Sequence, residues 1–371
     1  MTATNSTKCF SLLSRALFEG DRESGLPSEA ETSAAGHGPI SSLGSKEFAD
    51  FFGDLWSLAN ANHVIMRAFP ALHRILAEES TESAEWIDRA VLREQERISH
   101  ALSYLAPICQ ALEAAGDVIV IKSLDHWPDL GNDLDLYTNG SSDDVVAVMH
   151  KNFNAHPDER SWGDRLANKW NFIVPGLPEL VEVHVARLGQ TGEQINITHS
   201  LVANSSVQQF GGYALRVAAP EDRIIISTLQ RMYRHFYIRL CDIADNARLV
   251  DSGVIDYVHL KSLAESAGLW NGLATYLAIV SDYVKLYSGE ALPLPHLVKE
   301  AAKFGNELVR FKRSFLRIPI FPQAASLYAA EWKRLLLNGE VRNTFRLSLL
   351  PGLATAAALE LKLTGSDKGI W

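Results

Sequence analysis

A short run of β-branched residues, Val118 to Ile121, constrains the fold of this chain most, because it interrupts a pattern that is otherwise helical. Apolar residues recur at intervals of three and four before this run and again after Pro220, which predicts helices on both sides. Further β-prone runs predict more strands, at 134–137, 170–174, 180–185 and 213–217. We therefore expect an α/β (α+β) protein, with a small mixed sheet of about five strands between N- and C-terminal helical regions.

Turn and helix signals refine this arrangement. The segment from Pro175 to Pro178 indicates a tight turn, so the strands on either side of it are expected to form an antiparallel hairpin. The run at 213–217 is expected to be an edge strand. Helices are predicted over 46–78, 83–115, 143–153, 220–236, 238–250, 256–267, 270–288, 294–317 and 323–338, with one more near the C-terminus.

The same patterns divide the chain into four regions. Residues 1–45 are rich in Ser, Gly, Ala, Thr and Glu, and are expected to form a flexible leader with a short helix near Phe10 to Phe18. Residues 46–116 form an N-terminal helical region. The α/β domain expected to carry the chemistry spans 117–218, and a C-terminal helical domain spans 219–371.

The composition favours a small molecule or a protein as the partner rather than long nucleic acid. The 371 residues carry a formal net charge of −9, whereas proteins that bind long RNA or DNA usually present a basic surface. Cys9, Cys109 and Cys241 lie too far apart for a zinc motif and their odd number argues against a disulfide framework; Cys109 and Cys241 are expected to be reduced core residues. Because no secretory signal or membrane-length apolar run is evident, we expect a cytoplasmic protein with no membrane contact. The oligomeric state stays open.

Two aspartates in the second β-prone run point to a cation site. Asp133 and Asp135 are two residues apart, so on a strand their carboxylates face the same side. Like charges held that close repel unless a cation lies between them. The alternative is a solvated turn beside an edge strand. A third acid, Glu182, lies on a later strand and favours the cation site.

The order of these features resembles a known superfamily. Lys122-Ser123 follows the first strand, Asp133 and Asp135 begin the second, and Glu182 lies within the hairpin. This order is similar to that of the DNA-polymerase-β-like nucleotidyltransferases. The similarity is greatest to the bacterial branch labelled uncharacterised nucleotidyltransferase.

The resemblance covers about residues 118–269 and continues into the helical half. The matching pieces there are Pro220-Glu221-Asp222, Arg234-His235, Asp242, Ile255-Asp256-Tyr257 and Ala264 to Leu269. The resemblance implies a sheet of the polymerase-β type and transfer of a nucleoside monophosphate from a nucleoside triphosphate (NTP) to an acceptor. It also implies two Mg²⁺ ions, a metal that carboxylate oxygens bind well.

The resemblance implies a role for each residue that matches the family's motif. Asp133 and Asp135 would bridge both ions. Glu182 would complete the coordination of the ion nearer the acceptor hydroxyl and help to remove the proton of that hydroxyl. Ser123 would hold the β- and γ-phosphates. Lys122 departs from the family pattern, which has Gly-Ser or Lys-Gly here, because no glycine follows until Gly131. Lys122 is therefore either a source of charge for the phosphates or a surface lysine at a strand end.

Several basic residues have both a functional and a structural interpretation. Arg234 and His235, with Arg231, share one polar side of the helix after Pro220; they would meet the triphosphate across the cleft, or lie on a solvated helix face. His184, on the same face as Glu182, would position the acceptor or share its proton, or be a hydrogen-bonded structural residue.

The loop before the Asp133 strand is open to the same two interpretations. His126 and Trp127 in this loop would line the nucleotide or acceptor pocket. Asp125 and Asp129 beside them are expected to be solvated. A separate expectation concerns Arg239 and Asp242, which are three residues apart and are predicted to form an ion pair within one helix.

We thus expect a Mg²⁺-dependent nucleotidyltransferase that uses an NTP, ATP among the candidates, to modify a hydroxyl or similar group. The acceptor would be a small molecule, a peptide or a protein. Two alternatives stay open: a non-catalytic nucleotide-binding or interaction module of the same fold, and a phosphotransferase that uses the same metals.

Overall fold

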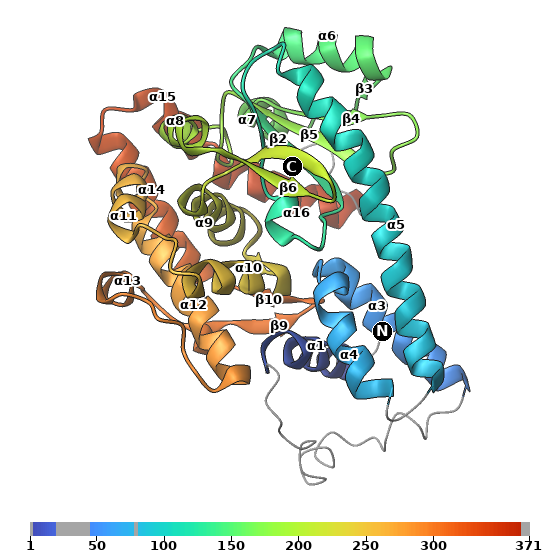
Figure 1. Cartoon of the computed structure of the whole chain (residues 1–371). Coiled ribbons are helices and arrows are strands. Elements are labelled where there is room, and N and C mark those ends of the chain that lie inside the picture. Colours follow the sequence, from blue (N-terminus) through green and yellow to red (C-terminus); the bar gives the residue numbers. More distant parts are fainter. Residues whose placement is uncertain (1–2, 20–44, 78–80, 365–371) are drawn as a thin grey trace.

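A seven-stranded mixed sheet occupies the upper half of the computed structural model as drawn in Figure 1, and the structure describes residues 3–19, 45–77 and 81–364. The strand order is β3-β4-β5-β2-β1-β7-β6. Two pairs, β2–β5 and β1–β7, are parallel, and the others are antiparallel. The bounds are β1 Val118–Val120, β2 Asp133–Thr138, β3 His156–Pro157, β4 Lys169–Ile173, β5 Leu180–Val185, β6 Ser206–Phe210 and β7 Tyr213–Val217.

The predicted α/β class, the mixed sheet and the β4–β5 hairpin are confirmed, but the sheet has two strands more than expected. The prediction of β7 as an edge strand is wrong, because β6 pairs outside it through a turn at Gly211-Gly212. Four of the five β6 residues are exposed, so β6 lacks the apolar run that would have marked it as a strand.

Helices cover both faces of the sheet. The long helix α5 (Thr81–Leu112) and α6 (Ser142–Phe153) pack on one face, and α8 (Ile195–Asn204) and α9 (Pro220–Thr228) lie on the other. The strands alternate accordingly: Val118 and Val120 join the α5 core, whereas Ile119 joins the core on the α9 side.

The N-terminal and C-terminal helices share one hydrophobic core. The N-terminal helices are α1 (Ala3–Phe18), α3 (Ser45–Ala61) and α4 (Ile65–Ala77), and their main partners are α10 (Leu240–Asp251) and α12 (Trp270–Ser288). Phe10 and Leu13 of α1 are buried in this core. The leader helix is therefore longer than expected and packed, while 20–44 lie outside the described residues.

The remaining elements are distributed along the chain. They are α7 (Trp162–Ala167), α11 (Tyr257–Ser266), α13 (His296–Ala301), α14 (Ala325–Leu337), α15 (Val341–Ser348), α16 (Leu350–Thr364), the 3₁₀-helices η2 (Ser123–His126) and η4 (Asn306–Leu308), and the π-helices η3 (Leu229–His235) and η5 (Ile320–Ala324). In the described ranges, each helix is too short or too polar to span a lipid bilayer. All three cysteines are unpaired, as expected.

A second, three-stranded sheet lies where the sequence predicted a helix. Its strands are β8 (Tyr237–Ile238), β9 (Arg310–Lys312) and β10 (Phe315–Arg317), in the order β8-β10-β9. The helix predicted over 294–317 ends at Ala301. Arg313 and Ser314 both adopt positive φ, 50° and 70°, and form the two-residue turn of the β9–β10 hairpin. Glycine or asparagine usually marks such a turn, so the sequence signal was absent.

Candidate active site

The predicted acids lie on two adjacent parallel strands. In the β2–β5 register, Asp135 is directly opposite Glu182. Leu134 and Leu136 point into the α5 core, so Asp133 and Asp135 face the α9 side of the sheet. The structure thus brings Asp135 and Glu182 together, while Asp133 lies exposed at the start of β2 and lines the same cavity.

Ser123 fixes the loop after β1 to the aspartate strand. Its hydroxyl donates to the carbonyl oxygen of Asp133 at 2.9 Å and accepts from the N–H of Asp135 at 2.7 Å. Its own N–H donates to the carbonyl of Ile121 at 2.6 Å. The residue lines the cavity, as predicted, but the groups expected to hold phosphate already have partners in the chain.

Lys122 forms the centre of a tight turn. Its φ of 60° and ψ of −61° are those of a γ-turn with positive φ, a conformation that is strained for a residue with a side chain. The side chain reaches the acids: Nζ pairs with Asp135 and lies 3.0 Å from Glu182 Oε1 and 3.3 Å from His184 Nε2. Lys122 is therefore neither a surface lysine nor a free phosphate ligand in this structure.

A second lysine, which the sequence analysis did not single out, also binds the acids. Lys169 Nζ on β4 lies 2.8 Å from Glu182 Oε2 and 2.8 Å from Asp164 Oδ1. Alternation along β4 places Lys169 on the face of Glu182, but the strand predicted there began at Trp170, one residue too late to include Lys169. We call Asp135, Glu182, His184, Lys122 and Lys169 the acid–lysine cluster.

The environment of this cluster separates the pKa values of its members. Burial, and then the neighbouring Glu182, raise the pKa of Asp135 to about 7. Burial opposes ionisation of Glu182 as well, but Lys122 and Lys169 hold its pKa well below the usual value. Burial and Lys122 lower the pKa of His184 to about 4, so its imidazole is neutral at pH 7. The cluster thus combines an ionised glutamate with a neutral imidazole 2.8 Å away.

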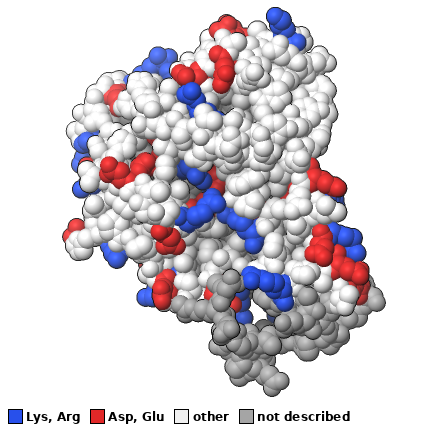
Figure 2. Space-filling model, in the orientation of Figure 1, with Lys and Arg blue, Asp and Glu red and all other residues white. Residues whose placement is uncertain are grey.

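A basic wall faces the acids across a cavity of about 240 Å³. Arg234 and His235 on η3, together with Tyr237 and Arg239, line it opposite Asp135. Figure 2 shows Lys and Arg side chains gathered in a hollow at the middle of this face, with acidic side chains beside them. The predicted placement of Arg234 and His235 across a cleft from the aspartates therefore agrees with the structure. Arg239 and Tyr237 are additional lining residues.

Arg231 and Arg239 support this wall in different ways. Arg231, which is 1% exposed, pairs with Asp242 at 2.7 Å, and Asp242 also accepts from the backbone N–H of Arg239 at 2.7 Å. The expected side-chain pair between Arg239 and Asp242 is therefore wrong, because Asp242 caps α10 and neutralises Arg231. The Arg239 guanidinium is left to donate to His63 Nε2 at 2.8 Å, at the cavity.

A second polar cluster lies on the far side of Lys122. His126 Nδ1 makes a short contact with Asp245, and its Nε2 lies 3.8 Å from Cys241 Sγ. Arg67 joins Asp245, at 2.7 Å, to Asp129, at 2.8 Å. We call these five residues the His126 cluster. His126 lines the cavity, as predicted, but both of its ring nitrogens have partners.

The remaining predictions for this loop need correction. Asp129 is not solvated: it is 1% exposed and accepts from the N–H of Met66 at 2.7 Å as well as from Arg67. Asp125 pairs with Arg223 at 2.7 Å. Trp127 packs edge-on against Phe210 in the core between the sheet and α5, and it is not among the residues that line the cavity.

The acids have the donor set that a divalent ion needs. One ligand atom each from Asp135, Glu182 and His184 lies within 4.8 Å of the others, and Asp133 adds an exposed carboxylate at the mouth. Mg²⁺ prefers oxygen ligands and commonly keeps several waters, which suits this partly open group. The residues therefore fit the metal, and the Lys122 ammonium shows that a cation is accepted between the two carboxylates.

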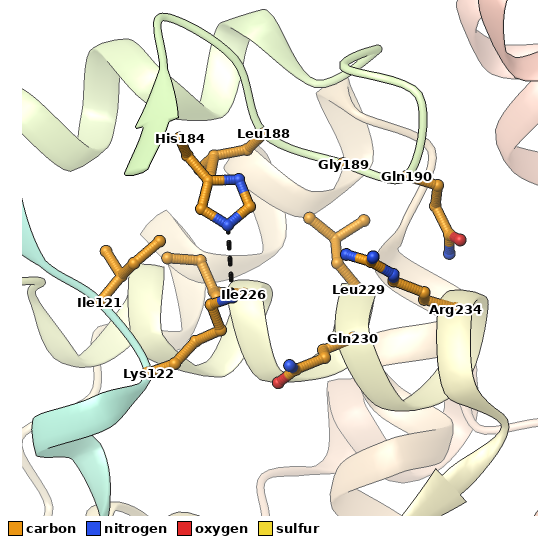
Figure 3. A pocket seen from close by; sticks show the side chains of 10 residues that line it. All are labelled: Ile121, Lys122, His184, Leu188, Gly189, Gln190, Ile226, Leu229, Gln230 and Arg234. Carbon is orange, nitrogen blue, oxygen red and sulfur yellow. Dashed lines mark hydrogen bonds between the residues drawn. The ribbon is translucent and has the colours of Figure 1, made fainter. Parts of the chain in front are cut away.

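A smaller cavity of about 40 Å³ adjoins this site on the η3 side (Figure 3). Ile121, Leu188, Ile226 and Leu229 give it apolar walls, and the remaining lining residues are Lys122, His184, Gly189, Gln190, Gln230 and Arg234. Figure 3 shows the Lys122 side chain rising from the end of β1 to meet the His184 ring. Lys122 is thus shared by both cavities.

Comparison with known proteins identifies no relative of this chain. No family model, no curated protein and no solved structure matches the chain. The site is therefore defined by its own geometry.

Proposed function

We propose that the chain is a Mg²⁺-dependent nucleotidyltransferase with a fold of the DNA-polymerase-β-like type. One observation carries the proposal: Asp135 and Glu182 lie side by side on parallel strands and face Arg234 across a cavity. Converging carboxylates suit divalent metal, and a guanidinium on the opposite wall suits the phosphates that such a metal accompanies. We further propose that the sheet from β1 to β5 corresponds to the catalytic sheet of that superfamily.

Each residue has a role in the proposed reaction. The acceptor oxygen attacks the α-phosphorus of the NTP, the bond from that phosphorus to the bridging oxygen breaks, and pyrophosphate leaves. Asp133, Asp135 and Glu182 would hold the metal, which when bound supplies positive charge to the phosphate oxygens. Arg234 and Arg239 bind and orient the triphosphate. The ionised Glu182 and the neutral His184, which lie 2.8 Å apart, would accept the acceptor's proton.

A second candidate is a non-catalytic nucleotide-binding module of the same fold. The observation that favours it is the pairing of the acids with Lys122 and Lys169, which already neutralises the charge that a metal would neutralise. Such a module would bind the triphosphate through its basic wall and leave it intact. Phosphoryl transfer is a third outcome that the same test detects.

The test is a product-mass assay with the whole protein. The wild type is incubated with each NTP, Mg²⁺ and a lysate of the source cells, beside Asp135→Asn and the surface control Asp117→Asn. We expect an acceptor to gain a nucleoside monophosphate with the wild type and Asp117→Asn, and not with Asp135→Asn. A gain of phosphate alone would replace the proposal with a phosphotransferase. Nucleotide binding without any product, across all four NTPs, would support the non-catalytic module.

A further inference from the structure

Lys122 occupies the position between the acids that a metal ion would need. Its ammonium pairs with Asp135 and lies 3.0 Å from Glu182 Oε1, the two carboxylates that lie directly opposite each other in the β2–β5 register. The side chains of all three residues are 13–14% exposed, so solvent screens these charges only in part. A divalent cation cannot share this space with the ammonium, since both are positive and both need the same oxygens.

The backbone at Lys122 is unusual for a lysine. Its positive φ is a conformation that glycine adopts readily and that other residues adopt at a cost in free energy. The turn directs the side chain back over the sheet to the acids. A lysine at this strained position is therefore placed to deliver its charge to the acid pair.

Lys122 and Lys169 differ in how firmly they are held. Lys169 is anchored twice, to Glu182 and to Asp164, and lies on the interior strand β4. Among the described residues, the Lys122 ammonium has one polar partner besides the acids, the His184 ring, and three cavities adjoin the Lys122 side chain. Two of them, the cavities of about 240 Å³ and 40 Å³, are also lined by Arg234. Lys122 can leave the acids for the larger of these cavities without breaking an ion pair to another carboxylate, whereas Lys169, which lines the same cavity, is also held by Asp164.

We propose that Lys122 is an exchangeable counter-ion that couples metal entry to triphosphate binding. Without nucleotide, its ammonium neutralises Asp135 and Glu182 and excludes divalent metal. When a triphosphate binds the Arg234 wall, its negative charge draws the ammonium off the acids, and the metal takes the vacated place. Lys122 is then a positioning residue whose ammonium pairs with the acids before the triphosphate binds and with the phosphates afterwards. This inference rests on the proposed function.

Divalent-metal binding to the whole protein without nucleotide tests the counter-ion role. Mn²⁺ binding is measured by electron paramagnetic resonance for the wild type, Lys122→Gly, Lys122→Met and the exposed control Lys285→Met. Lys122→Gly also relieves the positive φ, and Lys122→Met keeps the bulk without the charge. We expect both Lys122 variants to bind Mn²⁺ about tenfold more tightly than the wild type, the size of effect that one neighbouring charge has on a carboxylate. Lys285→Met should match the wild type.

A second arm adds a non-hydrolysable triphosphate analogue, with the analogue and Mn²⁺ alone as the reference. The wild type should then bind Mn²⁺ about as tightly as the Lys122 variants do. Equal Mn²⁺ affinity of the wild type and both variants without nucleotide would overturn the inference, as would no Mn²⁺ binding by any of them. Because this readout needs no turnover, its failure is distinct from failure of the product-mass assay.

Discussion

The acid–lysine cluster and the His126 cluster contain the same kinds of groups but hold them differently. Each joins two carboxylates, a histidine and at least one cation. In the His126 cluster the cation is the guanidinium of Arg67, which binds Asp129 and Asp245 in a fixed, planar geometry. In the acid–lysine cluster the cations are ammonium groups on flexible chains, and Asp133 nearby has no ion pair with any described residue.

This difference distinguishes the His126 cluster, a structural network, from the acid–lysine cluster, whose carboxylates exchange one cation for another in the proposal above. Guanidinium pairs that satisfy buried carboxylates on several sides fix the packing of α4, η2 and α10. Ammonium groups act as point charges that other cations can replace. A histidine beside carboxylates is therefore a weak signal by itself, and the identity of the neighbouring cation is what distinguishes the two clusters.

Removal of Arg67 should have the largest effect on stability. Arg67→Met would leave the buried Asp129 without an ion-pair partner and Asp245 paired mainly with His126, and it should lower the free energy of unfolding by about 3–5 kcal/mol. Urea denaturation measures this. Asp135→Asn, made in the other cluster, should not lower the same free energy, because Lys122 and Lys169 keep Glu182 as a partner and no buried charge is left unpaired. A loss of similar size in both variants would erase the distinction.

Arg234 should contribute to ligand binding. Arg234→Met removes a guanidinium from the wall opposite the acids, and NTP affinity measured by calorimetry should fall about tenfold, with a smaller loss at high salt. Arg310→Met, an exposed arginine of β9 outside the cavity, is the matched control and should bind as the wild type does. Equal losses in the two variants would indicate a general charge effect.

The pH dependence of stability should differ between wild type and Asp135→Asn. In the folded protein the pKa of Asp135 is about 7, against an ordinary value of 3.8, so the folded state retains a proton that the unfolded chain releases in this range. The contribution of Asp135 to stability is therefore fully present below about pH 4 and is lost as pH rises to about 7. Metal-free unfolding free energies should show a steeper fall in the wild type than in Asp135→Asn. Parallel slopes would contradict the assigned shift.

The fold class and the two central acids were predictable because they depend on local patterns. β-branched runs mark β1 and β5, and the two-residue spacing places Asp133 and Asp135 on one face. Arg67 was not predictable, because its role depends on which helix and loop become its neighbours, and Lys169 was missed because the predicted strand began one residue after it. The β9–β10 hairpin was missed because Arg313 and Ser314 occupy turn positions that usually carry glycine or asparagine.

The conformation of Lys122 could not be predicted from the sequence, because it too depends on contacts between distant parts of the chain. The departure from a glycine-containing pattern at this loop was visible in the sequence. The β2–β5 pairing brings Asp135 and Glu182 together, and the turn at Lys122 then places its ammonium between them. Long-range strand pairing thus determined what local patterns could not.

The most direct test of the account is the rate of label transfer from an α-labelled NTP by Asp133→Asn. Asp133 is exposed and its carboxylate has no hydrogen bond to a described residue, so the substitution should leave the unfolding free energy unchanged. If the β2 and β5 acids hold the metal for nucleotidyl transfer, the rate should fall by about a hundredfold or more. A rate equal to that of the wild type would contradict the account.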